Sequence, residues 1–134
     1  MSTIDEAIRS RMVADVALTA LVGQRIYKLR APQGVTAPFI VMFRVDASPI
    51  AGIRLDTAWQ RCRLQVSSFA ATAQGARDVA DAVRAAINRA PGRWPATVAG
   101  VQIDDVSFDL ERDLLEEDVD LYQVAQDYEC IYAE

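Results

Sequence analysis

The sequence predicts an α+β fold, a two-layer sandwich in which two α-helices pack on one face of a largely antiparallel β-sheet. Three observations support this class. Two segments carry apolar residues at helical spacing, and five shorter segments have the length and composition of strands, three of them with alternating apolar and polar residues. The segments follow one another as helix, three strands, helix and two strands, which favours one sheet covered by helices. A chain of 134 residues can bury roughly two thirds of its unfolded surface, so residues 1–134 are expected to form a single domain.

The first helix is predicted from Ser2 to Val22. Thr3 and Glu6 have the spacing of a capping box, in which the hydroxyl and the carboxylate satisfy backbone amides of the first turn. Gly23 supplies the left-handed residue that ends many helices. The apolar surface of this helix is broad, especially in its second half, so part of it is expected to face a neighbour.

Two strands are predicted next, at 25–29 and 38–46. The second is apolar on both faces, which is typical of a strand in the middle of a sheet, and Val41 and Phe43 are expected to point into the core. The following segment, "DASPIAGIRLD" at 46–56, contains Ser, Pro and Gly and is too long for a tight hairpin. It is interpreted as a loop or an extended arm.

The third strand, at 57–68, alternates clearly. Its apolar residues, among them Cys62, Leu64 and Val66, point one way, while Arg61 and Arg63 point the other. A helix at 72–90 follows, with alanines and valines on one stripe, and its end is predicted at Pro91-Gly92.

The remaining chain predicts a turn region at 94–100 and a hairpin with strands at 101–114 and 121–132. In the first strand Val106, Phe108 and Leu110 form the apolar face. The opposite face is acidic and is expected to meet Arg61 and Arg63 across the sheet. Its acids are Asp105, Asp109, Glu111, Asp127 and Glu129.

The composition argues against an enzyme. The chain has no histidine and one lysine, so no serine or cysteine has an obvious general base. The hairpin acids are interpreted as a solvated sheet face in preference to paired catalytic carboxylates. Cys62 and Cys130 are interpreted as small buried hydrophobes. No catalytic, cofactor-binding or metal-binding residue is predicted, and no cofactor.

Charge and hydropathy restrict the partners. The net charge of −5 and the pI near 4.7 disfavour binding to nucleic-acid phosphates. No apolar run approaches the ~20 residues that cross a bilayer, so no membrane association is expected, and no secretion signal is seen at the N-terminus. The protein is expected to be made inside the cell.

Three blocks of the sequence carry a resemblance to a known family. The first is "IDEAIRSRMVADVALTALVGQRIYKLRAPQGVTAPFIVMFRV", the second "CRLQVSSFAATAQGARDVADAVRAAI" and the third "ERDLLEEDVDLYQVAQDYECIY". Their order and spacing resemble the small tail-completion, or tail-terminator, proteins of long-tailed bacteriophages and related phage-like particles. None of the blocks contains a catalytic motif.

The resemblance implies a structural virion protein that forms a homo-oligomeric ring, expected to be a hexamer. Such a ring caps the head-proximal end of the tail tube, contacts the tail tube protein and joins the tube to the head connector. DNA would pass through its channel without specific binding. It would be assembled in the bacterial cytoplasm and located at the head–tail interface of the virion.

The same resemblance implies candidate contacts between subunits. Three basic residues around the predicted first strand would meet acids of the next subunit in the loop between the last two strands. The basic residues are Arg25, Lys28 and Arg30, and the acids are Glu116, Glu117 and Asp118.

Two alternatives stay open at this point. A head-completion or neck adaptor protein from the same region of a phage has similar size and equally lacks catalytic residues. A non-viral module that binds a small ligand on its sheet face would predict a monomer or dimer with an apolar concavity.

Overall fold

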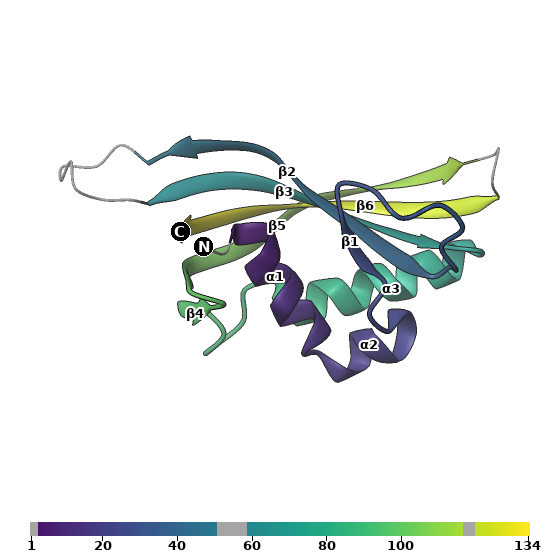
Figure 1. The fold of residues 1–134 in the computed structure, drawn as a ribbon, viewed down its shortest axis with the longest axis horizontal. Coiled ribbons are helices and arrows are strands. Elements are labelled where there is room, and N and C mark those ends of the chain that lie inside the picture. The colour runs from purple at the N-terminus through teal and green to yellow at the C-terminus, as the bar shows by residue number, and fades with distance from the viewer. Residues whose placement is uncertain (1–2, 51–58, 117–119) are drawn as a thin grey trace.

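The computed structural model describes residues 3–50, 59–116 and 120–134. It shows an α+β protein with three helices on one side of a twisted six-stranded sheet (Figure 1). The elements are α1 (Ile4–Val13), α2 (Val16–Val22), β1 (Ile26–Lys28), β2 (Phe39–Pro49), β3 (Gln60–Ala70), α3 (Ala73–Ile87), β4 (Ala96–Val98), β5 (Val101–Glu116) and β6 (Leu121–Ala133). The α+β class is confirmed, whereas the expected number of two helices is wrong.

The predicted first helix is divided into two. The capping box at its start is confirmed, because the Thr3 side chain accepts from the Glu6 amide and the Glu6 carboxylate accepts from the Thr3 amide. The helix then ends at Val13, and Asp15 caps α2 by accepting from the amide of Leu18 at 2.9 Å. A short carboxylate that can bond to nearby amides favours a cap over a helix interior, which explains the break.

The sheet is mixed, with strand order β1-β2-β3-β6-β5-β4. β1 runs parallel to β2, and the other four pairings are antiparallel. β4 is a short strand inside the region predicted as a turn. β2 continues to Pro49, so the start of the predicted connection at 46–56 is strand, and residues 51–56 of it lie outside the described residues.

The face of β2 that enters the core is the reverse of the prediction. Ile40 and Met42 are completely buried, and Met42 pairs with Val66 on the face of the sheet that the helices cover. Val41 and Phe43 are half-buried on the opposite face, which we call the outer face. Because both sides of this strand are apolar, its alternation carries no information about which side faces the helices.

The pairing of β5 with β6 has two register shifts, between Ile103 and Asp105 and between Phe108 and Leu110. From Asp105 to Phe108 the predicted alternation holds, but at the second shift the pairing moves by one residue and the faces of β5 are reversed. Leu110, predicted on the core face, therefore lies opposite Asp127 on the outer face and is 39% exposed. Glu111, predicted on the outer face, points to the helix side. A β-bulge has this effect because side chains alternate with a period of two.

The core lies between the sheet and the helices. Cys62, Leu64 and Val66 of β3 are buried as predicted and pack with residues of α3, β5 and β6. Cys62 lies opposite Cys130 on β6, and both are buried free thiols, as expected. α3 is capped by Thr72 and ends at Ile87, a few residues before the predicted stop at Pro91.

The two leucines Leu64 and Leu110 give a direct test of these faces. Leu64→Ala should lower the free energy of unfolding by roughly 2–5 kcal/mol, because the side chain is fully buried and its removal leaves a cavity. Leu110→Ala, the matched control beyond the register shift, should cost less than about 1 kcal/mol. Urea denaturation measures both, and equal losses would contradict the outward position of Leu110.

Candidate interaction surfaces

Ion pairs cross the outer face of the sheet. Arg61 of β3 contacts Glu129 of β6 at 2.7 Å, and Arg63 contacts Asp109 of β5 at 2.5 Å. The predicted pairing of these arginines with hairpin acids is therefore confirmed. Both pairs are roughly half-exposed, so each contributes at most about 1 kcal/mol to stability.

Two of the acids predicted on this face have other partners. Asp105 pairs with Arg89, which follows the end of α3. Glu111 pairs with Arg77 of α3 at 3.3 Å, and Arg77 also contacts Asp113 at 2.8 Å. These contacts attach α3 and its C-terminal extension to β5.

Asp127 is the buried member of the outer face. Its side chain is only 8% exposed, and Oδ2 lies 3.4 Å from a guanidinium nitrogen of Arg63 and 3.8 Å from one of Arg112. Oδ1 has no hydrogen-bond partner among the described residues. Sequence reasoning placed Asp127 on a solvated face, and the two long arginine side chains explain why it is covered instead.

The predicted basic residues lie around β1, and two of them have partners in their own chain. Arg25 donates from Nε to the carbonyl of Pro38 at 2.9 Å. Lys28 contacts Glu6 of α1 at 3.0 Å, and this hydrogen bond lowers the pKa of the Glu6 carboxyl. Arg30 is exposed. These contacts connect β1 to α1 and to the start of β2.

The predicted acidic contact residues are only partly described. Glu116 is the last residue of β5, whereas Glu117 and Asp118 lie outside the described residues. The sheet order puts β1 and β5 on opposite sides of the central β3–β6 pair. The proposed meeting of the basic and acidic residues therefore remains a prediction about two copies of the chain.

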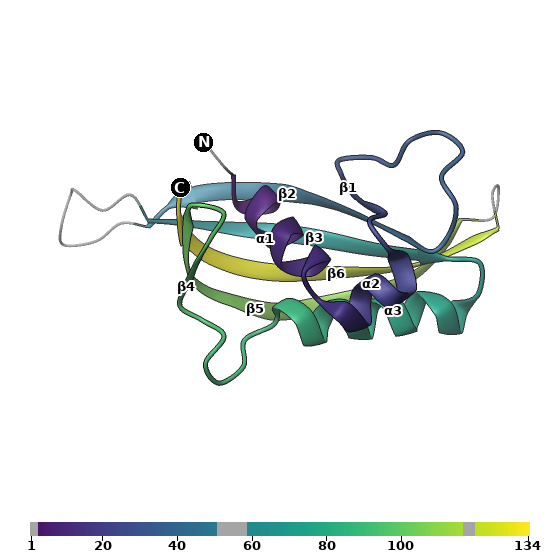
Figure 2. The same ribbon diagram turned by 60° about the horizontal axis from the view of Figure 1, so that its bottom comes forward.

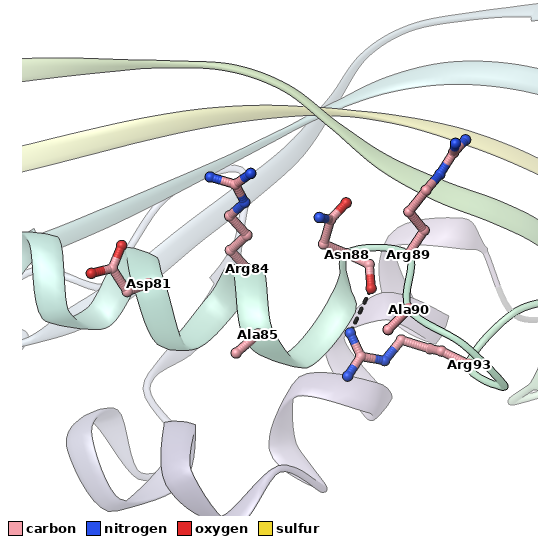
Figure 3. A pocket seen from close by; sticks show the side chains of 7 residues that line it. All are labelled: Asp81, Arg84, Ala85, Asn88, Arg89, Ala90 and Arg93. Carbon is pink, nitrogen blue, oxygen red and sulfur yellow. Dashed lines mark hydrogen bonds between the residues drawn. The ribbon is translucent and has the colours of Figure 1, made fainter.

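Sequence reasoning missed a pocket of about 380 Å³ at the C-terminal end of α3 (Figure 3). We call it the arginine pocket, because Arg84, Arg89 and Arg93 line it. Arg84 and Arg89 project from the helix end towards the sheet, and Arg93 folds back beneath it, donating to the carbonyl of Asn88 at 2.5 Å. The available signal is the spacing of these arginines around a helix end, from which no prediction was made.

The buried titratable groups on the helix side are held in their neutral forms. Burial raises the pKa of the Tyr128 phenol, and a hydrogen bond with Cys62, together with burial, raises the pKa of the Cys130 thiol. Among the residues that the structure describes, no three His, Cys, Asp or Glu side chains group as a metal site would require. The described helices are all too short or too polar to span a membrane.

Residues 6–133 match the family model described as "Tail completion protein gp17". The chain belongs to this family. It is a structural tail protein of a phage-like particle and a component of the virion, as the resemblance in its sequence implied.

The fold has a counterpart in a solved particle. A chain in the structure described as "Virion of native gene transfer agent (GTA) particle" superposes with a TM-score of 0.74 at 17% sequence identity. The likeness covers 98% of this chain and 95% of that chain, which shows that the two share a fold. No curated protein matches the sequence.

Asp127 provides a test of the outer face. Asp127→Asn should lower the free energy of unfolding by about 1–3 kcal/mol, because it removes a buried charge that two arginines contact. Glu129→Gln, which changes an exposed pair on the same strand, should cost less than about 1 kcal/mol. The measurement is urea denaturation at pH 7, and a larger loss for Glu129→Gln would reverse our assignment of the buried acid.

Proposed function

We propose that the protein acts as a tail terminator, a hexameric ring that caps the head-proximal end of the tail tube and joins it to the head connector. The observation that carries the proposal is the family match, which runs through nearly all of residues 1–134 and bears the description of a tail completion protein. This role requires binding surfaces and no catalytic centre. We further propose that the chain acts as one domain within each ring subunit.

The symmetry of the tube end supports a ring. A tube of stacked rings presents a rotationally symmetric end, and a heterologous contact that closes on itself produces such a ring. A heterologous contact needs two different surfaces on each subunit. We propose as these surfaces the basic residues around β1 and the acidic end of the β5–β6 hairpin, and the strand order, in which β3 and β6 lie between β1 and β5, is compatible with this.

The charge of the protein suits a channel for DNA. The net charge of −5 disfavours adhesion of phosphates, so an acidic ring would let DNA pass without binding it. The proposed partners are therefore other copies of the chain, the tail tube protein and the head connector protein, with DNA in transit.

The ring proposal is tested by mass measurement. Light scattering and native mass spectrometry of the purified chain, alone and mixed with the tail tube protein, should detect a species of six copies. A ring that forms only on the tube would appear only in the mixture. A strict two-fold dimer in both samples would contradict the proposal.

The joining role is tested by genetic complementation of a particle that lacks this gene. We expect heads without tails and tails of irregular or excessive length, visible by electron microscopy, and we expect the wild-type gene to restore whole particles. Tails of normal length joined to heads in the absence of the protein would overturn the terminator role. Tails of normal length that fail to join would instead identify a head-completion adaptor.

The acidic hairpin end is tested in the same assay. Changing Glu116, Glu117 and Asp118 to Lys should leave folding intact, because replacing one charged residue by another outside a core usually changes stability by less than about 0.5 kcal/mol. It should reduce the yield of infectious or transducing particles. Normal yield would remove this segment from the contact surface.

A further inference from the structure

We propose that the arginine pocket at the end of α3 binds a single carboxylate, the side chain of an Asp or Glu that a protein partner presents. The presence of such a partner rests on the proposed function, in which the chain meets other subunits, the tail tube protein and the head connector. The chemistry of the site rests on described residues alone.

The pocket combines charged walls with small uncharged side chains. Arg84 and Arg89 extend from α3 towards the sheet, and Arg93 lies beneath the end of the helix (Figure 3). Ala85 and Ala90 also line the pocket, and their methyl groups offer apolar surface. The side chains of Asp and Glu have a matching form, because a short apolar stem ends in a carboxylate that guanidinium groups bind.

Two of the guanidinium groups are held in place. Arg84 lies over the ring of Phe108, with its central carbon 4.0 Å from the ring centroid, and Arg93 donates to the carbonyl of Asn88. Each guanidinium has five N–H donors, so these contacts leave donors available. A positioned guanidinium loses little further side-chain entropy when it binds a carboxylate.

The polar groups at the end of α3 also suit an anion. The C-terminal end of a helix carries partial negative charge, which by itself disfavours a carboxylate. Here Trp94 donates from Nε1 to the carbonyl of Ile87 at 3.1 Å, and Arg93 donates to the next carbonyl along the chain. The side-chain oxygen of Asn88 accepts from the amide of Phe108 at 2.8 Å, which leaves the NH₂ group of Asn88 as a further donor.

The charge of the pocket matches one carboxylate. Its lining contains three arginines and one acid, Asp81, and Arg89 is paired with Asp105. In the part of the chain that the structure describes, neither Arg84 nor Arg93 forms an ion pair. About one positive charge is therefore left for a ligand, on a protein whose net charge is −5.

DNA is a poorer match for the pocket. A nucleic-acid strand carries one phosphate charge per roughly 3.4 Å, so a bound phosphate brings its neighbours with it. These neighbours would meet the acids on either side of the arginines, namely Asp78 and Asp81 of α3 and Asp105 of β5. A single acidic side chain on a protein surface avoids this repulsion.

Titration of the wild-type chain with a small probe tests the chemistry of the site. The probe is a blocked tripeptide, acetyl-Gly-Glu-Gly-amide, and its matched control has Gln in place of Glu. In ¹H–¹⁵N NMR spectra the Nε–H signals of Arg84 and Arg93 should shift with the Glu peptide until they saturate, whereas that of Arg30, an exposed arginine far along the chain, should not saturate. The Gln peptide should bind at least tenfold more weakly.

Anionic controls distinguish a carboxylate site from a phosphate site. Inorganic phosphate and a thymidine hexanucleotide should each bind no more tightly than the Glu peptide. Tighter binding of the hexanucleotide would overturn the assignment to a protein carboxylate, as would equal binding of the Glu and Gln peptides. These titrations require no variant, so misfolding cannot obscure the result.

The source of the carboxylate is found by comparing associations of the full chain. Arg84→Gln with Arg93→Gln should weaken at least one association at least tenfold, with an unchanged thermal midpoint. Native mass spectrometry measures self-association, and sedimentation measures binding to the tail tube protein and to the head connector protein. A loss of self-association assigns the carboxylate to a second copy of the chain, and a loss with one of the other proteins assigns it to that protein.

The charge-preserving variant Arg84→Lys with Arg93→Lys should show a smaller loss, because it keeps both charges and removes only the forked donors. Unchanged association of the Gln variant with all three proteins would overturn the inference and leave the terminator role intact. Failure of the wild type to form rings, alone or on the tube, would instead contradict the proposed function without altering the peptide titration.

Discussion

The antiparallel pairing of β3 with β6 is the contact on which the rest of the structure depends. It extends from Gln60 opposite Tyr132 to Ala70 opposite Tyr122, and it joins segments that lie far apart in the sequence. β2 and β5 attach to its two sides, so neither half of the sheet exists without it. Closing so long a stretch of chain costs conformational entropy before the strands meet. α3 lies within that stretch, and Gln126 of β6 secures it by donating to the carbonyl of Ala80 at 3.1 Å.

The register shift after Phe108 in β5 distributes charge between the two faces of the sheet. Before the shift, residues facing the helices are apolar, as the core requires. After it, Glu111 turns towards α3 and accepts from Gln126 at 3.1 Å, and the phenol of Tyr128 donates to the same glutamine at 2.9 Å. Asp109, at the shift itself, reaches Arg63 on the outer face. One extra residue thus gives the hairpin a polar network beneath α3 and an ion pair on the other side.

The sequence predicts well where its pattern is one-sided. The alternation of β3 identifies its buried face, the Thr3 and Glu6 spacing identifies a helix start, and the order of elements identifies the α+β class and the family. The sequence predicts poorly where the two faces of a strand are equally apolar, or where a single residue determines the register of a strand or the end of a helix. β2 is apolar on both sides, the bulge at Asp109 has no compositional signal, and Asp15 could equally occupy a helix surface. The arginine pocket depends on the path of the chain after Ile87, and the periodicity of apolar residues gives no information about that path.

The two cysteines make the central pairing observable in solution. Cys62 and Cys130 face each other across β3 and β6 at 1% and 0% exposure, and no disulfide joins them. A thiol reagent can attack only when the strands separate, since the thiolate forms poorly while buried. The rate of labelling therefore reports the opening of the sheet centre, separately from fraying at its edges. A slower labelling of these two native cysteines in assembled particles than in the free chain would show that incorporation reduces the opening of the sheet centre. The comparison requires no substitution.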